Sequence, residues 1–295
     1  MSAKKPNNIA SHISVSLPEI HHPASQPAIL NPMHPRQNAS EHIIIATANV
    51  HFGDAIRLDG GLDSLRDLAP DILMLQEVTN SADELVRQLK KDGYDLIHFA
   101  PEYGLAIAIH ASSKLSVVPN STRTYELQKM SAIEYRMAQR FAKLPHKMNA
   151  HGLQMVRFEA EDGQILTVAN TRTTVSSNRF DRRKQVARMG ELFEPILQDA
   201  LIVGGDMNHF PGPQRADIKM CQKAGLRRVD LASEPTWHAR NSKLYRKIAR
   251  LRRKPIEELH GELDALLYRG ELELASVKVV DILSDHRAIV GEFAL

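Results

Sequence analysis

Acidic residues stand at the ends of short apolar runs at several places in the chain, and this repeated placement constrains the fold more than any other feature. Glu77 and Asp206 each follow such a run, Asp264 opens one, and Asp285 comes just before the last one. Apolar runs of this length are typical of buried strands. The pattern therefore predicts several carboxylates at strand ends.

These groups suit a hard cation and a phosphate ester. Mg²⁺ prefers oxygen ligands and usually takes one or two carboxylates, leaving its other positions to water and substrate phosphate. A hydrolytic site also needs a group that handles water and donors for the developing negative charge. Asp206 and Asn208 are two residues apart, so on an extended segment we expect both side chains on one side. An ordinary Asx turn, which Asp-x-Asn-x-x-Pro would also favour, is the alternative. Asn49 and His286 add an amide and an imidazole.

Seven polar segments occur in a fixed order: Thr47–Val50, Leu75–Val78, Asn170–Thr171, Gly205–Asn208, Thr236–Trp237, Leu263–Asp264 and Ser284–His286. The series resembles the endonuclease/exonuclease/phosphatase superfamily, which includes pancreatic-type deoxyribonucleases, abasic-site endonucleases, deadenylases, inositol-polyphosphate phosphatases and neutral sphingomyelinases. The resemblance runs from about residue 43 to the C-terminus. It implies metal-dependent phosphoester chemistry, and it is far more specific for the fold than for the substrate.

Composition sets the broad class. The chain has 295 residues, of which 43% are hydrophobic, enough for a substantial core in one large α/β domain or two small ones. Its single cysteine, Cys221, excludes an intramolecular disulfide and fits a reducing compartment. No apolar run approaches the roughly 18 residues of a membrane span, and no apolar segment follows Lys4 and Lys5 as in a secretory signal. We expect a cytoplasmic protein.

The first 40 residues differ from the rest of the chain. They hold six of the fifteen prolines, several histidines and no long apolar pattern. This composition predicts a disordered tail at 1–40, in which we expect no dedicated metal role for the histidines. The catalytic domain is then expected at 41–295.

The remaining pattern predicts an α/β fold. Strands that alternate with helices, then hairpins, then further strands favour two mixed sheets packed together with helices outside. The resemblance implies the same four-layer sandwich of two packed mixed β-sheets flanked by helices. The expected strands are 43–50, 71–75, 94–99, 105–109, 153–158, 165–169, 201–204, 263–268, 272–280 and 288–293. The expected helices are 60–68, 81–91, 178–197 and 218–223, the second capped by Ser81.

The resemblance assigns roles to the strand-end residues. Glu77 and Asp285 are expected to hold the metal, Mg²⁺ with Mn²⁺ as the alternative. Asp206 is expected to activate or orient the attacking water. Asn208 is expected to contact the scissile phosphate, and Asn49 to reach phosphate or a metal-bound water.

Other polar residues are expected to support this centre. His286 contacts phosphate or transfers a proton, with Asp264 orienting its ring and stabilising the charged form. Asn170 is expected among the substrate-binding residues. Gln76 alternates away from its neighbour Glu77 and is expected to be structural. Trp237, the only tryptophan, is either a core aromatic, which we favour, or a platform for a substrate base.

Arg172 departs from the family pattern. Many members have histidine after Asn-Thr, but this chain has arginine. Arginine cannot serve as an acid at neutral pH, although its planar fork can clamp phosphate oxygens. We expect it in the catalytic centre, where its presence leaves leaving-group protonation in question. On the next helix, Arg182, Arg183 and Gln185 either tie the helix to the site or form a solvated face.

A basic segment spans residues 240–254, with eight basic residues and no acidic ones. Since the whole chain carries +3, the remainder carries −5. Leu244, Ile248 and Leu251 recur at helical spacing. The segment, including Arg250 and Arg253, is predicted to grip nucleic-acid phosphates; an anionic membrane surface and a solvated helix are the alternatives.

The leading hypothesis is a Mg²⁺-dependent phosphodiesterase, an endonuclease or exonuclease acting on DNA or RNA. The second is a phosphoinositide or phospholipid head-group phosphohydrolase on the same scaffold, and the third is a catalytically silent binding protein. Val78-Thr79 follows Glu77 where many abasic-site enzymes have Lys-Thr. The sequence therefore gives no support for abasic-site specificity.

Overall fold

The computed structural model describes most of the chain from His42 onward. The described residues are 42–132, 134–136, 139, 148–174, 179–208, 215–239, 250, 255 and 258–295. The predicted tail at 1–40 lies outside them, as does the basic segment except for Arg250.

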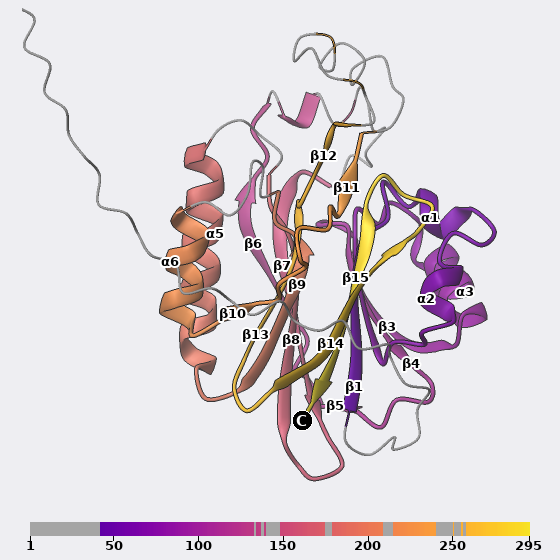
Figure 1. Ribbon diagram of the computed structural model, residues 1–295, viewed down its shortest axis with the longest axis vertical. Helices are drawn as coiled ribbons and strands as arrows, with labels where there is room; N and C mark the ends of the chain where they lie inside the picture. The colour runs from indigo at the N-terminus through magenta and orange to yellow at the C-terminus, as the bar shows by residue number, and fades with distance from the viewer. Residues whose placement is uncertain are drawn as a thin grey trace, which may run out of the picture.

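The first of two large sheets has six strands in the order β14-β15-β1-β2-β4-β3 (Figure 1). β1 and β2 are parallel, and the other neighbours are antiparallel. The strands are β1 (His42–Asn49), β2 (Ile72–Gln76), β3 (Tyr94–Ala100), β4 (Leu105–His110), β14 (Glu273–Asp281) and β15 (Arg287–Ala294).

The second sheet has seven strands in the order β10-β13-β9-β8-β7-β5, with β6 also paired to β7. Only β8 and β9 are parallel. The strands are β5 (Ser116–Val117), β6 (Arg123–Lys129), β7 (Ala150–Glu159), β8 (Ile165–Arg172), β9 (Ala200–Asp206), β10 (Arg227–Arg228) and β13 (Asp264–Arg269). A small separate ribbon pairs β11 (Trp237–His238) with β12 (His260–Gly261).

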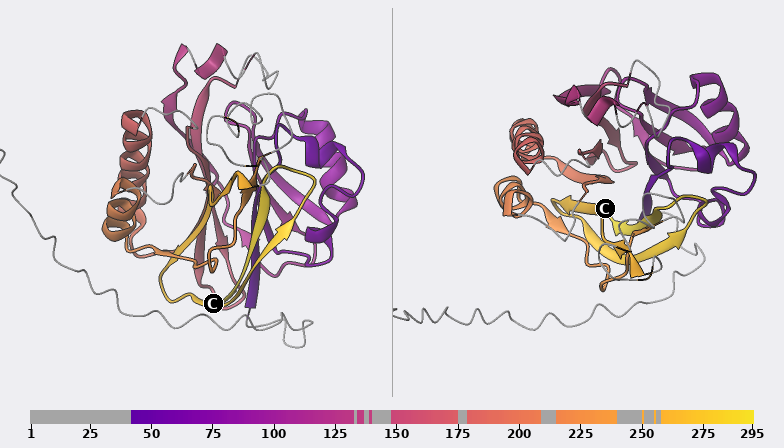
Figure 2. Two further views of the ribbon diagram at one scale, coloured as in Figure 1. Left: turned by 45° about the horizontal axis from the view of Figure 1, so that its top comes forward. Right: turned by 90° about the horizontal axis from the view of Figure 1, so that it is seen from above.

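Helices lie on opposite outer sides of the two sheets (Figures 1 and 2). Beside the first sheet are α1 (Asp54–Arg57), α2 (Asp63–Arg66) and α3 (Ala82–Lys91). Beside the second are α5 (Arg179–Phe193), the 3₁₀ turn η1 (Glu194–Ile196) and α6 (Arg215–Ala224). The predicted four-layer sandwich is confirmed. Among the described residues, no helix is long and apolar enough to span a membrane.

The buried apolar residues form three clusters. One lies between the two sheets, and one lies under each layer of helices. The central cluster joins Ile45 and Met74 of the first sheet to Val168 and Ile202 of the second. β2 is buried along its whole length, which explains why its sequence is a continuous apolar run and does not alternate. Each fully buried aliphatic side chain contributes about 1.5–3 kcal/mol.

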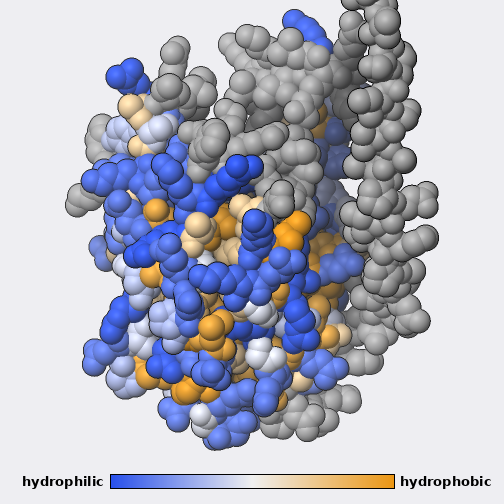
Figure 3. Space-filling model, turned by 90° about the vertical axis from the view of Figure 1, so that its left-hand side faces the viewer, coloured by the Kyte–Doolittle hydropathy of each residue, from blue (hydrophilic) through white to orange (hydrophobic). Residues whose placement is uncertain are grey.

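The outer surface over α5 and α6 has a different character. Hydrophilic side chains predominate on the described part of this face, with apolar residues scattered among them (Figure 3). On the inner side of these helices, Val186, Met189 and Met220 join the buried cluster that covers the second sheet. The helices therefore serve as an amphipathic cover.

The predicted helix at 60–68 is wrong in its extent. Gly60 has a left-handed backbone, with φ of +75°. A Cβ on Gly61 would lie 1.9 Å from the carbonyl oxygen of Ala55, so this glycine permits a close turn. The helix consequently begins only at Asp63. The predicted cap of the next helix is confirmed, because the Ser81 hydroxyl accepts a hydrogen bond from the backbone N–H of Glu84 at 3.2 Å.

A buried amide joins the two sheets. Asn170 on β8 donates from Nδ2 to the carbonyl oxygens of Leu75 and Ala106, each at 2.9 Å. Its Oδ1 accepts from Nε2 of Gln76 at 2.8 Å. The expectation that Gln76 is structural is confirmed by this contact and by its complete burial. The amide oxygen and nitrogen of Asn170 are therefore both bonded to groups inside the protein.

We predict that Asn170→Ala lowers the free energy of unfolding by about 3 kcal/mol, because it leaves buried polar groups without partners. Urea unfolding checks this, with Asn149→Ala at an exposed position as the matched control. A variant of unchanged stability that loses turnover would show instead that Asn170 binds substrate.

Candidate active site

The polar strand ends of both sheets meet at one edge of the molecule. β1 and β2 end there at Asn49 and Gln76, and β8 and β9 end there at Arg172 and Asp206. Because β13 runs antiparallel to β9, its first residue, Asp264, lies directly opposite Asp206. Tertiary pairing thus gathers groups that are up to about 240 residues apart in the sequence.

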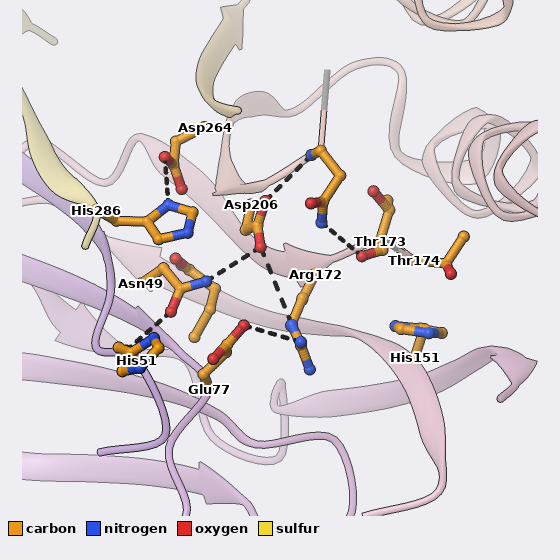
Figure 4. A network of polar contacts seen from close by, with 12 residues as sticks. Asn49, His51, Glu77, His151, Arg172, Thr173, Thr174, Asp206, Asp264 and His286 are labelled. Atoms are coloured by element: carbon orange, nitrogen blue, oxygen red, sulfur yellow. Dashed lines mark hydrogen bonds and ion pairs between the residues drawn. The ribbon is translucent and has the colours of Figure 1, made fainter. Parts of the chain in front are cut away.

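Asp206 is the centre of the hydrogen-bond network (Figure 4). Its Oδ2 accepts from Nδ2 of Asn49 at 3.0 Å, and its Oδ1 accepts from the backbone N–H of Asn208 at 3.1 Å. Asp206 is 1% exposed and Asn49 is fully buried. The network therefore holds the carboxylate in one orientation.

The extended geometry expected for Asp206 to Asn208 is wrong. β9 ends at Asp206, and Asn208 has a left-handed backbone with φ of +49°. The bond from the Asn208 N–H to the Asp206 side chain closes an Asx-type turn, which competes with strand continuation. Nδ2 of Asn208 then donates to the carbonyl oxygen of Thr173 at 2.8 Å.

Two residues of α5 support this turn. Arg182 donates to the carbonyl oxygen of Asn208, and Oε1 of Gln185 accepts from the backbone N–H of Thr174 at 2.9 Å. Both side chains are buried, whereas Arg183 is exposed. Of the two alternatives predicted for this helix, attachment to the site and a solvated face, the first is correct for Arg182 and Gln185.

Two glycines before Asp206 permit close approach of the backbone. A Cβ on Gly204 would lie 2.3 Å from Cε of Met74, and one on Gly205 would lie 2.0 Å from the carbonyl oxygen of Thr171. Larger residues at these positions would push β9 away from β8 and from the first sheet. The Gly-Gly pair is therefore needed for the close packing of β9.

Arg172 lies between the acids of the two sheets. Its Nη2 is 2.8 Å from Oε1 of Glu77, and its Nε is 4.0 Å from Oδ2 of Asp206. Arg172 and Glu77 are both buried. Glu77 has φ of +58°, a left-handed conformation that is costly for a non-glycine residue and persists only where its surroundings enforce it.

His286 is paired with Asp264 behind the central carboxylate. Nδ1 of His286 lies 2.8 Å from Oδ2 of Asp264, as expected. The hydroxyl of Thr236 accepts from the backbone N–H groups of Leu263 and Asp264, both at 3.0 Å. These bonds fix the start of β13, and so the position of the carboxylate that orients the ring.

Burial and charge give the two central groups unusual ionisation. Burial raises the pKa of Asp206 to about 7, with Asp264 and Glu77 adding to the rise while His286 and Arg172 oppose it. For His286, burial lowers the pKa, but the negative charge and hydrogen bond of Asp264 outweigh it and raise the pKa to about 10. The site therefore favours the protonated form of both groups.

Asp285 has two neighbours that the sequence did not reveal. Nδ1 of His51 lies 2.8 Å from Oδ1 of Asp285, and the indole N–H of Trp237 donates to Oδ2 at 3.4 Å. His51 is in a left-handed turn with φ of +44°, and its position two residues after Asn49 was the only available signal. Trp237 is partly exposed, so the favoured assignment to the core is wrong.

A second imidazole–carboxylate pair, His151 and Glu134, lies near enough to Arg172 for its charge to act on the carboxyl. Nε2 of His151 is 2.9 Å from Oε1 of Glu134, which also accepts from the hydroxyl of Thr174 at 2.6 Å. Burial alone raises the pKa of Glu134, but these hydrogen bonds and the charge of Arg172 hold it below its usual value. No sequence pattern had marked these residues.

One predicted substrate-binding position lies away from this network. Asn170 lies in the sheet interface described above. Arg250 is exposed, and Arg253 lies outside the described residues. All the other predicted site residues lie at the shared edge: Asn49, Glu77, Arg172, Asp206, Asn208, Asp264, Asp285 and His286.

The oxygen groups at this edge suit a hard divalent cation. Glu77 and Asp285 supply carboxylates, and Mg²⁺ needs only one or two. Among the described residues, Nδ1 of His51 lies 2.8 Å from Oδ1 of Asp285, so a cation bound here would share this carboxylate with the imidazole. The described residues contain no cage of three or more carboxylate, histidine or cysteine ligands. Water and substrate would complete the coordination.

Comparison with known proteins identifies the family. A model of the Endonuclease/Exonuclease/phosphatase family matches residues 46–286, whereas no match was found among curated proteins. Similar solved structures include the human Nocturnin catalytic domain with bound sulfate, at 18% identity over 85% of this chain and 94% of that one, with a TM-score of 0.60.

Two further structures show the same likeness. One is D. rerio TDP2 complexed with single-strand DNA product, at 18% identity over 85% of this chain and 98% of that one, with a TM-score of 0.57. The other is ANGEL2, described as a 2′,3′-cyclic phosphatase, at 14% identity over 86% and 95%, with a TM-score of 0.61. At these identities the likeness establishes the fold.

We predict that Asp264→Asn lowers the pKa of His286 from about 10 toward its ordinary value of about 6.5, because the variant loses the negative charge beside the ring. The imidazolium would then lose its proton near neutral pH. NMR titration of the ring checks this, with Asp162→Asn in a distant hairpin turn as control. An unchanged titration would contradict the assigned pairing.

Proposed function

Because this chain belongs to the endonuclease/exonuclease/phosphatase family, whose members are phosphoester hydrolases, we propose that it is a divalent-metal-dependent phosphodiesterase that cleaves nucleic acid. The observation that carries this proposal is the meeting of two oriented groups, Asp206 held by Asn49 and His286 held by Asp264, at an edge that also presents the carboxylates of Glu77 and Asp285. An acceptor, a donor and cation ligands are thereby placed around one reaction centre.

Asp206 serves as the group that takes a proton from water. Burial raises the pKa of Asp206, which gives its carboxylate more basicity for accepting a proton than an exposed aspartate has. The bonds from Asn49 and Asn208 aim the carboxylate, so that water is held in line with the phosphorus atom.

His286 serves as the donor. Nδ1 is engaged by Asp264, so Nε2 is the nitrogen that donates to the phosphate. Its charge stabilises the negative charge that develops on the phosphate oxygens. His286 can also give a proton to the leaving oxygen, a step that Arg172 cannot perform. The presence of both Asp206 and the Asp264–His286 pair therefore favours an active enzyme over a silent binding protein.

Glu77 and Asp285 would hold the divalent cation, which acts as a Lewis acid on the phosphate when bound. Trp237 and His51 position Asp285 through the contacts described above. The left-handed backbone of Glu77 places its carboxylate just beyond the end of β2. Both ligands are thus fixed by local geometry before any cation binds.

The nucleic-acid assignment is supported by charge. Eight basic residues between positions 240 and 254 follow Trp237 and precede Asp264 in the sequence, and the two flanking residues lie at the site. Of this segment, Arg250 is described and is exposed. A solved relative of the same fold, TDP2, was crystallised with a single-strand DNA product. Polyanions with several phosphates match this arrangement best.

We predict that Glu77→Gln and Asp206→Asn each lower turnover by about two orders of magnitude or more, the scale of electrostatic and acid–base groups, and that EDTA abolishes activity. The assay offers Mg²⁺ or Mn²⁺ with labelled DNA, RNA, phosphoinositide vesicles and sphingomyelin. Circular plasmid distinguishes internal from terminal cleavage.

Glu161→Gln and Asp162→Asn, both exposed on the turn between β7 and β8, are the matched controls and should keep full activity. Undiminished activity in EDTA, or wild-type turnover in both site variants, would rule out this centre. Hydrolysis of the vesicles or of sphingomyelin without cleavage of nucleic acid would assign a lipid head-group substrate.

We also predict that replacing Arg250, Arg252, Arg253 and Lys254 with Gln weakens DNA binding regardless of sequence and flattens its salt dependence. Each duplex phosphate contact contributes about 0.9 to the slope of log affinity against log salt concentration. Fluorescence anisotropy at several salt concentrations measures this slope. The fourfold variant should still hydrolyse a short dinucleotide-like ester. If the variant keeps the slope of the wild type, the basic segment is not part of the DNA-binding surface.

A further inference from the structure

The guanidinium of Arg172 contacts Glu77, the residue that is expected to hold the cation. Nη2 lies 2.8 Å from Oε1 of Glu77, which is the charge-assisted distance of a full ion pair. The side chains of both residues are only 8% exposed, so water screens their attraction weakly. One carboxylate oxygen of the expected metal ligand is therefore already engaged by a permanent positive charge.

Arg172 also acts on the second acid of the centre. Its Nε lies 4.0 Å from Oδ2 of Asp206, and its charge opposes the rise in the pKa of that carboxyl. Glu77 and Asp206 come from different sheets and would repel each other if both were ionised. Arg172, at the end of β8, compensates both of them within the protein.

A permanent charge at this position has a consequence for the cation. Arginine stays protonated at all relevant pH values, so the ion pair cannot be released by deprotonation. A divalent ion approaching Glu77 must displace the guanidinium or bind close to it. Both routes cost free energy, since like charges in a poorly solvated site repel strongly.

We propose that Arg172 competes with the divalent cation for Glu77, so that the free protein binds the cation weakly and a phosphate anion strengthens this binding by drawing Arg172 to itself. The inference rests on the proposed metal-dependent function. The coupling is reciprocal, because any ligand that raises the affinity for a second ligand is itself bound more tightly when the second is present.

Calorimetric titration of metal-free protein with Mn²⁺ tests the competition. Arg172→Gln and Arg172→Met remove the charge, and we expect at least about tenfold tighter Mn²⁺ binding, since a charge at this range shifts the proton affinity of a carboxylate by about 10- to 1,000-fold. Arg172→Lys keeps the charge and should stay within about threefold of the wild type. Arg157→Gln is the matched control. It breaks an ion pair with Asp199 near the end of β7 that lies away from the site.

Thermal unfolding gives a readout that does not depend on turnover. Without the arginine, the two acids lack their shared cation, so metal-free Arg172→Gln and Arg172→Met should melt at lower temperature than the wild type. Saturating Mn²⁺ should raise their melting temperature more than that of the wild type, because tighter ligand binding stabilises the folded state more. If one variant does not fold, the other still decides the comparison.

Methylphosphonate tests the coupling. It should tighten Mn²⁺ binding to the wild type and have no such effect on Arg172→Gln. Equal Mn²⁺ affinity in the wild type and in the folded neutral variants would overturn the competition, and the absence of an effect of methylphosphonate on the wild type would overturn the coupling. Failure of every variant and the wild type to bind Mn²⁺ would overturn the proposed metal-dependent function instead.

Discussion

Apolar packing between the two sheets determines where the chemistry of this protein can take place. Ile45 and Met74 on one side meet Val168 and Ile202 on the other within a single buried cluster. This packing fixes the separation and alignment of the sheets, and strands that begin and end in register deliver their last residues to a common edge. The polar residues just beyond the apolar runs are thereby brought together, although they contribute little to the packing that places them.

Charge compensation is the second condition for such a site. A carboxylate that becomes buried when the protein folds needs a partner of opposite charge, since an unpaired buried charge destabilises a protein by several kcal/mol. Glu77 and Asp206 share Arg172, and Asp264 pairs with His286. Asp285 has neighbours as well, the ring of His51 and the indole N–H of Trp237. The polar network therefore persists as a preformed arrangement, and the same pairings set the ionisation that hydrolysis would use.

Some of these features belong to the family and others to this chain. The ordered strand-end motifs accompany the family fold over residues 46–286. Arg172 follows the Asn-Thr pair in this chain. Its permanent charge holds Glu77 and Asp206 together but cannot move a proton. Proton transfer then rests on Asp206 and His286.

The sequence alone determined the fold class and most of the strand-end residues, because short apolar runs and their polar ends are local signals. It determined less about contacts, since Asn49 and Asp206 are 157 residues apart and only strand pairing makes them neighbours. Tertiary structure alone decided that Asn170 turns into the sheet interface, that Asn208 leaves the strand in a left-handed turn, and that His51 reaches Asp285. These outcomes depend on which buried groups compete for the same hydrogen bonds and charges, a competition that exists only once the two sheets have packed.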